Sequence, residues 1–372
     1  FSQIVDRLGG SDNAFTNQDM TAYHQEVARE HLATIMAMEA DRMVHLRLDS
    51  ATVLSERDVI LNERSQVIDN NPSSRLREAV NAAIYRNHPY GRPVIGWRHE
   101  IAAYDLGDAQ GFYKQWYAPN NAILIVAGDV AASEVRQLAE THFGAIPARA
   151  VPTRQRLREP PPVAARRLSL SSPEVRYPSV TRSYLAPSYR SAALADTVAP
   201  LTAETPYALA ILGEILSSGA VGRLHRKLVL DQGIAIGVSA GYSGDMRDYG
   251  SFSFSVAPRD TEALDAVEAA LDTEIANLLA EGISEEELAA AKQRLMIESV
   301  KARDGLAGPA SLVAYALGAD STLADLQAWP DRIAAVKSDS VMTAARTVLT
   351  PANSVTAILL PEPTGTATVP AP

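Results

Sequence analysis

Hydrophobic positions follow two periods along the chain, one typical of strands and one typical of helices. Strand-like segments occupy residues 13–16, 21–27, 122–128, 180–185 and 235–242. Helical spacing covers residues 30–48, 106–117, 132–143, 207–216, 261–281 and 285–302. Because strand-like segments are interspersed with amphipathic helical ones, we expect a mixed fold in which sheets are packed by helices.

The segment AILIVAG at residues 122–128 is the most hydrophobic of the strand-like segments. A strand that is buried on both faces has such a nearly continuous apolar run instead of strict alternation. We therefore expect residues 122–128 to form a buried strand.

The chain opens with FSQIVDRLGG, which has the pattern of the last turns of an amphipathic helix that ends at Gly9 and Gly10. A native terminus seldom begins inside a helix. We therefore expect further residues ahead of Phe1, and any signal peptide would lie among them.

Residues 146–165, IPARAVPTRQRLREPPPVAA, gather prolines and arginines without a sustained apolar period. This composition is typical of an extended linker between domains. We expect an N-terminal domain at residues 1–150, a linker at residues 151–168 and a C-terminal domain at residues 169–372.

A short internal repeat relates the two predicted domains. YAPNNAILIVAG at residues 117–128 and LTPANSVTAILLP at residues 349–361 share a helix exit, a Pro-x-Asn turn and a hydrophobic strand. The turn prolines are Pro119 and Pro351, so the offset between the copies is 351 minus 119, or 232. Self-similarity at one offset predicts two homologous domains, and it places the start of the first copy ahead of Phe1.

Composition narrows the class of protein. The 372 residues are 47% hydrophobic, with a mean hydropathy of −0.06, which is typical of a globular protein of about two domains. A formal net charge of −10 without a basic stripe argues against a nucleic-acid partner. No apolar run is long enough to predict a membrane span. The absence of cysteine excludes disulfides and thiolate metal sites.

The segment SERDVILNERSQVIDNNP, which begins at Ser55, places two carboxylates on one face of a predicted helix with Ser55 as its N-cap. Glu56 and Glu63 lie about two helical turns apart. Val59 and Ile60 lie between them, so we expect this face to point inward. Buried carboxylates need a cation, a metal or hydrogen-bond donors, whereas a solvated surface pair does not. Periodicity alone leaves both alternatives open.

We identify no complete zinc-peptidase motif, no Gly-x-Ser-x-Gly elbow of a serine hydrolase and no phosphate-binding loop in the sequence. Neither His-Glu-x-x-His nor His-x-x-Glu-His occurs among the seven histidines, so the 372 residues contain no complete zinc-peptidase signature. The glycine-containing stretch at residues 217–228 lacks the Gly-Lys-Ser/Thr ending of a phosphate-binding loop. It predicts a turn that leads into a helix.

Several segments, in this order, resemble the pitrilysin or insulinase family of zinc peptidases, which includes the mitochondrial processing peptidase. They are GGSDNAFTNQDMTAY (residues 9–23), MEADRM (38–43), ERDVILNE (56–63), NHPYGRPVIGWRHEI (87–101) and FYKQWYAPNNAILIVAGDV (112–130). The resemblance weakens but persists at residues 212–242. It covers most of the chain, and the order of its motifs makes it specific.

The resemblance implies an α+β fold of two homologous α/β sandwich domains, each a mostly antiparallel sheet packed by helices. It also implies a zinc-dependent endopeptidase that hydrolyses peptides or unfolded polypeptides within a clam-shell chamber. In that family an inverted His-x-x-Glu-His supplies two zinc ligands and the general base, and a later glutamate completes the metal site. This makes Glu63 the distal zinc ligand and Glu56 the acidic residue that orients the histidine side. It also places the histidine motif ahead of Phe1. Two imidazoles and one carboxylate leave a fourth position for a water molecule that zinc activates.

The resemblance also implies a role for the first strand. Asn13, Ala14 and Phe15 correspond to a strand that lies along the family's cleft and pairs with the substrate backbone. An ordinary sheet edge is the alternative interpretation.

One departure from the family concerns the second half of the chain. Active relatives carry an Arg and a Tyr, seven residues apart, that reach the substrate carbonyl. Val229 and Ile236 stand at these positions here, and neither side chain can donate a hydrogen bond to an oxyanion. A one-residue misalignment, with Arg226 or Tyr242 in the role, is one alternative. Otherwise the chain needs a related subunit that carries the Arg/Tyr pair, so we expect a heterodimer.

A non-catalytic member of the family that serves as a scaffold or peptide-binding subunit is the rival interpretation, because some such subunits have lost the histidine motif. The presence of both Glu56 and Glu63 argues against it. Bacterial relatives make the periplasm the expected location.

Overall fold

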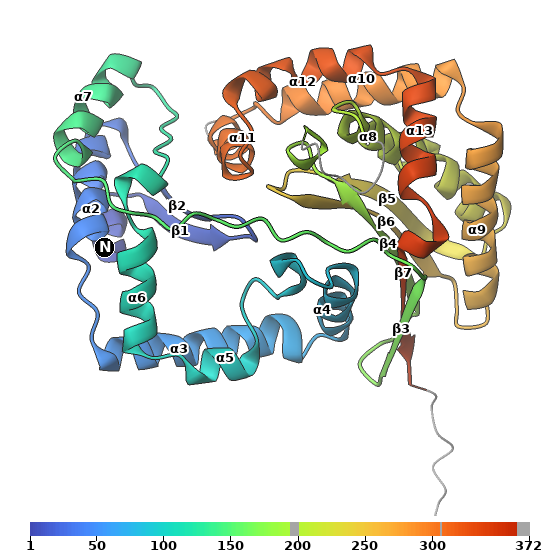
Figure 1. Cartoon of the computed structure of the whole chain (residues 1–372), viewed down its shortest axis with the longest axis horizontal. Coiled ribbons are helices and arrows are strands. Elements are labelled where there is room, and N and C mark those ends of the chain that lie inside the picture. Colours follow the sequence, from blue (N-terminus) through green and yellow to red (C-terminus); the bar gives the residue numbers. More distant parts are fainter. Residues whose placement is uncertain (194–200, 306, 363–372) are drawn as a thin grey trace, which may run out of the picture. The chain divides into compact units, whose positions relative to one another are not determined.

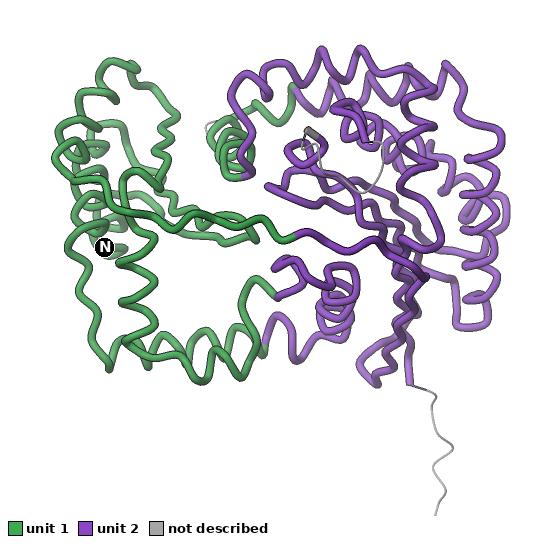
Figure 2. Tube along the Cα trace, in the orientation of Figure 1, with its two compact units in different colours: residues 1–65, 93–157, 300–318 green, residues 66–92, 158–299, 319–372 purple. Residues whose placement is uncertain are grey.

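The chain forms two compact units, each assembled from segments that are distant in the sequence (Figure 2). The computed structural model describes residues 1–193, 201–305 and 307–362. Unit 1 combines Phe1–Ser65, Pro93–Leu157 and Val300–Gly318, and unit 2 combines Gln66–Arg92, Arg158–Ser299 and the residues from Ala319 onward. The domains predicted at residues 1–150 and 169–372 follow chain order, whereas the compact units combine distant segments. The predicted domain boundaries refer to the two copies of the repeat, and they stay a prediction.

Unit 2 is built on a five-stranded sheet in the order β3-β7-β4-β6-β5 (Figure 1). The strands are β3 (Arg166–Ser172), β4 (Ser179–Pro187), β5 (Ala235–Ser243), β6 (Tyr249–Pro258) and β7 (Ser354–Pro361). Strands β3 and β7 are parallel, and the other three pairings are antiparallel. This antiparallel-rich sheet with packed helices confirms the predicted fold class.

Helices pack against the sheet of unit 2 in two separate hydrophobic clusters. The helices are α4 (Pro72–Ile84), α8 (Thr205–Leu216), α9 (Leu264–Glu281), α10 (Glu285–Lys301), α12 (Leu323–Ala335) and α13 (Ser338–Val348). Leu76, Val80 and Ile84 recur every fourth residue on α4, and they pack with β7 in the smaller cluster. The larger cluster joins α8, α9 and α13 to β4 and β6. Strand β7 therefore has a strand on each edge and a helix against its apolar side chains.

Unit 1 contains one β-hairpin and several helices. The elements are α1 (Ser2–Arg7), β1 (Ser11–Thr16), β2 (Thr21–Glu26), α2 (Leu32–His45), α3 (Ser50–Arg64), α5 (Arg98–Ala103), α6 (Leu106–Trp116), α7 (Ala132–Phe143) and α11 (Ala307–Gly318). The strands pair antiparallel from Ser11 opposite Glu26 to Thr16 opposite Thr21. Both hydrophobic clusters of the described residues lie in unit 2. Unit 1 is held by scattered buried side chains such as Val5.

The structure confirms the internal repeat. Helices α6 and α13 begin at Leu106 and Ser338 and end at Trp116 and Val348, so both ends are related by the offset of 232 that the turn prolines give. Helices α2 and α9 begin at the same offset, since 264 minus 32 is also 232. A short 3-10 turn follows at Pro119–Asn121 in one copy and at Pro351–Asn353 in the other. The path from helix to turn is therefore built twice, although residues 122–128, which follow the first turn, form no strand comparable to β7.

The buried strand predicted at residues 122–128 is wrong. Within the described chain this segment belongs to no strand, and the Ile123 and Leu124 side chains are 59% and 50% exposed. An apolar run becomes a buried strand only where neighbouring strands complete its hydrogen bonds and other elements cover its faces. None of the described elements does this for residues 122–128.

The other predicted segments are confirmed to within a few residues, including the short helix α1 before Gly9 and Gly10. The predicted linker at residues 151–168 has no helix or strand until β3 begins at Arg166. Among the described residues, no helix combines the length and apolar character needed to cross a bilayer.

Candidate functional site

Helix α3, which carries both candidate glutamates, begins earlier than predicted. Asp49 is its N-cap, and the Asp49 carboxylate accepts a hydrogen bond from the Thr52 backbone N–H at 2.8 Å. This bond satisfies an N–H that the helix leaves without a partner, and it lowers the pKa of Asp49. The predicted N-cap at Ser55 is therefore wrong, because Ser55 lies in the second turn of the helix.

Glu56 and Glu63 lie on the exposed side of α3. Val59, between them, is 54% exposed, so the prediction that this face points inward is wrong for the described residues. The inward positions are Val53 and Arg64. The Arg64 guanidinium is buried and donates to the Gly96 backbone carbonyl at 2.7 Å, which fixes the rotation of the helix and leaves the glutamate face open.

The residues present do not form a zinc site by themselves. Across residues 1–193, 201–305 and 307–362, no three His, Asp or Glu side chains gather closely enough to hold a metal ion. A catalytic zinc site needs three protein ligands. Glu63 could therefore supply at most one ligand, and any zinc site that includes it would need donors from outside the described residues.

Strand β1 carries the three candidate substrate residues. Asn13 and Ala14 are exposed, and the Asn13 side-chain oxygen accepts the Ala14 backbone N–H at 2.8 Å. Within the described part of the chain β1 pairs only with β2, so its outer edge has no neighbouring strand. Such an edge can accept an extended peptide by adding it as a further strand.

Phe15, the third residue, is half-buried and packs on an aromatic residue that the sequence analysis missed. Its ring stacks on Tyr315 of α11, with ring centroids 5.4 Å apart and planes at 26°. The imidazole of His24 on β2 is tilted against the Phe15 ring, with ring centroids 6.1 Å apart. No motif or spacing relates Phe15 to Tyr315, because three hundred positions separate them (315 minus 15). Only the placement of α11 in unit 1 reveals the contact.

The positions expected to hold an Arg and a Tyr carry apolar side chains with no donor. Val229 packs partly buried against the larger cluster, and Ile236 is 58% exposed on β5. Tyr242 is not available as the alternative, because its hydroxyl donates to the Pro187 carbonyl at 2.6 Å and burial raises its pKa well above the usual value. Arg226 is exposed. Of the two residues considered for a one-residue misalignment, only Arg226 therefore remains a candidate donor.

A Gly-x-Ser-x-Gly pattern does occur, GVSAG at residues 237–241, so the sequence analysis was wrong to identify none. In serine hydrolases this pattern forms a sharp turn between a strand and a helix. Here Ser239 lies in the middle of β5 and pairs with Ser255 of β6. The pattern is therefore part of a strand and forms no nucleophile elbow.

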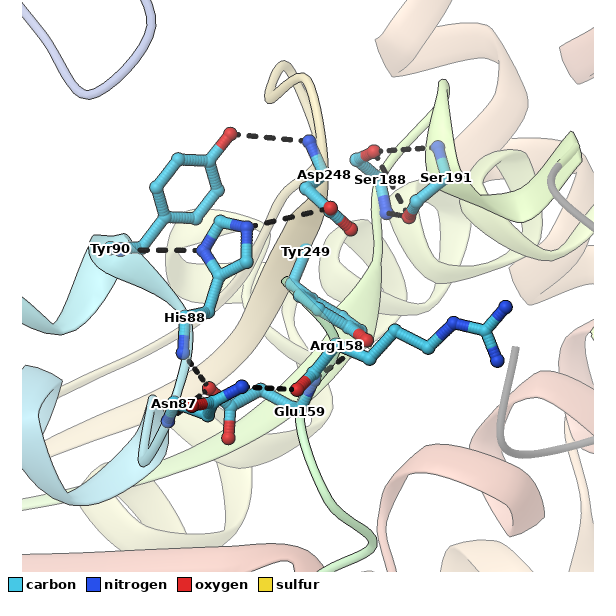
Figure 3. A network of polar contacts seen from close by, with 9 residues as sticks. All are labelled: Asn87, His88, Tyr90, Arg158, Glu159, Ser188, Ser191, Asp248 and Tyr249. Atoms are coloured by element: carbon cyan, nitrogen blue, oxygen red, sulfur yellow. Dashed lines mark hydrogen bonds and ion pairs between the residues drawn. The ribbon is translucent and has the colours of Figure 1, made fainter. Parts of the chain in front are cut away.

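A buried carboxylate organises the NHPYG segment in unit 2 (Figure 3). Glu159 is 3% exposed. Its carboxylate accepts hydrogen bonds from the backbone N–H groups of Arg86, Asn87 and His88, at 2.9 and 2.8 Å for the first two. The Glu159 N–H donates to the Tyr249 hydroxyl at 3.1 Å. Three donors replace the water that this carboxylate loses on burial.

The same network continues through the imidazole of His88. Its Nδ1 accepts the Tyr90 backbone N–H at 3.3 Å, and its Nε2 lies 3.4 Å from an Asp248 carboxylate oxygen. The Tyr90 hydroxyl accepts the Asp248 backbone N–H at 3.1 Å. Because each of these polar groups already has a protein partner, we interpret the network as a structural hydrogen-bond network and not as a catalytic group.

The described residues thus form a mixed helix-and-sheet protein in which the outer edge of β1 has no neighbouring strand and Glu63 is a candidate metal ligand. The family model described as "Insulinase (Peptidase family M16)" matches residues 1–97, and the one described as "Peptidase M16 inactive domain" matches residues 104–295. The second match covers more than half of the chain. The chain therefore belongs to peptidase family M16, which confirms the resemblance to the insulinase and pitrilysin peptidases.

Curated relatives support this assignment. The chain is 32% identical to the zinc protease PqqE of Helicobacter pylori over 193 residues, which are 51% of this chain and 43% of the relative. It is 24% identical over 300 residues to the uncharacterized zinc protease YmxG of Bacillus subtilis, covering 79% of this chain and 67% of the relative. It is 27% identical over 143 residues to the mitochondrial-processing peptidase subunit beta of Blastocladiella emersonii, covering 38% of this chain and 30% of the relative. The chain thus spans less than half the length of the first of these relatives.

Solved structures agree. A protease from Helicobacter pylori superposes with a TM-score of 0.85 at 26% identity, covering 96% of this chain and 84% of that chain.

Proposed function

We propose that this chain is part of a zinc-dependent endopeptidase that hydrolyses peptides or unfolded polypeptides. The observation that carries this proposal is the insulinase match over residues 1–97, which includes both α3 and β1. In this proposal Glu63 is one zinc ligand, and Glu56, on the same exposed side of α3, orients the other ligands. The free edge of β1 at Asn13, Ala14 and Phe15 binds the substrate backbone.

The proposal requires further zinc ligands. The 372 residues contain no His-x-x-Glu-His motif, so the histidine ligands and the general base would come from residues outside this sequence. Relatives named zinc proteases support zinc as the metal. A carboxylate on an open helix face is able to join two imidazoles in such a site.

We propose that the active form pairs this chain with a related subunit. Val229 and Ile236 supply no donor for a developing oxyanion, and the loss of one such donor costs about a hundredfold or more in rate. A relative that is named as a beta subunit supports a two-subunit arrangement. The partner would carry the Arg/Tyr pair. Location in the periplasm stays part of this proposal.

A scaffold or peptide-binding subunit is the alternative function. The absence of the histidine motif from these residues and the family description of residues 104–295 as an inactive domain favour it. Such a subunit would still bind peptides along β1, but it would need no zinc.

Metal analysis of the product of the whole reading frame separates the two functions. The Glu63→Gln variant is expected to keep the circular dichroism of the wild type and to lose most of its bound zinc, because a neutral amide is a poor zinc ligand. Glu140→Gln, at an exposed position on α7, is the matched control and should keep its zinc. Full zinc occupancy in Glu63→Gln would refute the assignment, and a wild-type protein without zinc would favour the scaffold.

A further inference from the structure

Each compact unit contains a segment from the other copy of the repeat (Figure 2). Residues 66–92, which carry α4, come from the first copy and belong to unit 2. Residues 300–318, which carry α11, come from the second copy and belong to unit 1. Adding the repeat offset of 232 to 66 and to 92 gives 298 and 324, a range that contains residues 300–318. The two copies have therefore exchanged equivalent segments.

Side-chain contacts hold both of the exchanged helices. Leu76, Val80 and Ile84 of α4 pack with β7 of the second copy in the smaller hydrophobic cluster. Tyr315 of α11 stacks on Phe15 of β1 in the first copy. Burial of aliphatic and aromatic side chains stabilises such contacts whether or not the chain between the two copies is continuous.

The chain between the two copies is fixed at two points and lacks regular structure between them. At the first point, the Asn120 side chain accepts the Arg149 backbone N–H at 3.0 Å and donates to the Arg149 carbonyl at 2.9 Å. At the second point, the Asn87 side-chain amide donates to the Arg158 carbonyl at 3.0 Å. Residues 150–157, between these points, form no helix or strand.

Two arginines lie in this irregular stretch. Arg154 is exposed and Arg156 is half-buried, and the residues that follow them, Gln155 and Leu157, are both exposed. Exposed segments without regular structure are the preferred sites of proteolytic nicking. The peptide bonds after Arg154 and Arg156 therefore suit an endopeptidase that prefers arginine, whereas the backbone at Arg149 is held by Asn120.

We propose that residues 150–157 are a processing segment, at which an arginine-specific endopeptidase converts the chain into two polypeptides that stay assembled through the exchanged helices. Hydrolysis adds one water molecule across the peptide bond, which leaves a carboxylate on Arg154 or Arg156 and an ammonium group on the next residue. The N-terminal polypeptide then supplies α4 to unit 2, and the C-terminal polypeptide supplies α11 to unit 1. Separation would remove a helix from each unit. This inference goes beyond the proposed function and does not depend on the zinc site.

Limited digestion with trypsin, followed by mass spectrometry, tests the site of cleavage in the product of the whole reading frame. Cleavage after Arg154 or Arg156 is expected at least about tenfold faster than after Arg136, which is also exposed but lies in α7, because a helix must open before it is cut. The double variant Arg154→Gln/Arg156→Gln should lose this first cut, and Arg136→Gln should keep it. A first cut within residues 1–362 but outside residues 150–157 would overturn the proposal.

The assembly of the nicked product is measured separately. It is expected to elute from size-exclusion chromatography at the volume of the intact protein and to separate into two polypeptides in denaturant. The dissociation constant of the two polypeptides, measured by dilution, should rise about tenfold or more in Val80→Ala, which removes two methyl groups from the contact of α4 with β7. Val221→Ala, at a position that is 62% exposed, is the control and should leave this constant unchanged. Separation in buffer without denaturant, or an unchanged constant in Val80→Ala, would overturn the proposal.

Discussion

The side-chain amides of Asn121 and Asn353 make the same hydrogen bond in the two copies of the repeat. Asn121 donates to the Trp116 carbonyl and Asn353 to the Val348 carbonyl, each at 2.9 Å and each five residues back in the chain. Both bonds satisfy a carbonyl that the end of the preceding helix leaves without an intrahelical partner. Asn353 is 8% exposed, whereas Asn121 is exposed.

This difference in burial predicts different costs for the same substitution. Asn353 also donates to the Leu185 carbonyl at 2.8 Å, so Asn353→Ala leaves two carbonyls without this donor and should lower the free energy of unfolding by about 1 to 3 kcal/mol. Asn121→Ala leaves the Trp116 carbonyl to be hydrated by water, so this variant should lower the free energy of unfolding by less than about 0.5 kcal/mol. Urea denaturation of both variants measures the two values. Equal losses would contradict the argument from burial.

The carboxylate of Glu159 should contribute strongly to the stability of unit 2. Glu159→Gln removes the charge and one acceptor oxygen, and it directs an NH₂ group toward the backbone N–H groups of residues 86–88. We expect a loss of roughly 2 to 5 kcal/mol in the free energy of unfolding. Glu174→Gln, at an exposed position in the same unit, is the control. If Glu159→Gln lowers the free energy of unfolding no more than the control does, the hydrogen bonds of the Glu159 carboxylate contribute little to stability.

The stack of Phe15 on Tyr315 predicts a measurable coupling. A double-mutant cycle of Phe15→Ala and Tyr315→Ala should give a coupling energy of about 0.5 to 1.5 kcal/mol in unfolding experiments, as expected for packed rings. Phe112 and Trp116 of α6, whose ring centroids lie 6.2 Å apart, form the control pair. Their coupling energy should be weaker, at about 0.2 to 0.5 kcal/mol. A coupling energy near zero for Phe15 and Tyr315 would mean that α11 does not stabilise β1 through this contact.

Acid should weaken the start of α12. Hydrogen bonds from the Thr322 side chain and backbone, and then from Arg332, lower the pKa of Asp325 from 3.8 to about 2. A depressed pKa means that the carboxylate stabilises the fold above pH 3.8 and that this stabilisation is lost as the pH falls toward 2. The unfolding temperature of Asp325→Asn should therefore lie below that of the wild type near neutral pH and approach it near pH 2.

The control for this titration is Gln327→Ala, at an exposed position on the same helix. Because this substitution removes no titratable group, its difference from the wild type should stay nearly constant over the same pH range. A gap for Asp325→Asn that does not change with pH would indicate that the substitution acts through the shape of the cap and not through charge.

The sequence by itself determined the local elements and the family. Periodicity placed β1, β2, α2, α6 and α7 in unit 1, and β4, β5, α8, α9 and α10 in unit 2, because a strand or helix that packs on one face repeats its apolar positions at a fixed spacing. It did not place β3, β6, α4, α12 or α13. The Pro-x-Asn turns at Pro119 and Pro351 revealed the repeat, since the same turn geometry needs the same residues. The ordered motifs were sufficient to identify the family.

Only the tertiary structure decided which of these elements are buried and what they contact. Residues 122–128 and β7 share a pattern, yet one lies exposed and the other is central, because burial is a property of the neighbours and not of the run itself. Nothing in the sequence around Glu63 specified which side of α3 faces outward, since Arg64 sets the rotation through its bond to Gly96. The contact of Phe15 with Tyr315 likewise depends on where α11 packs, which no local pattern encodes.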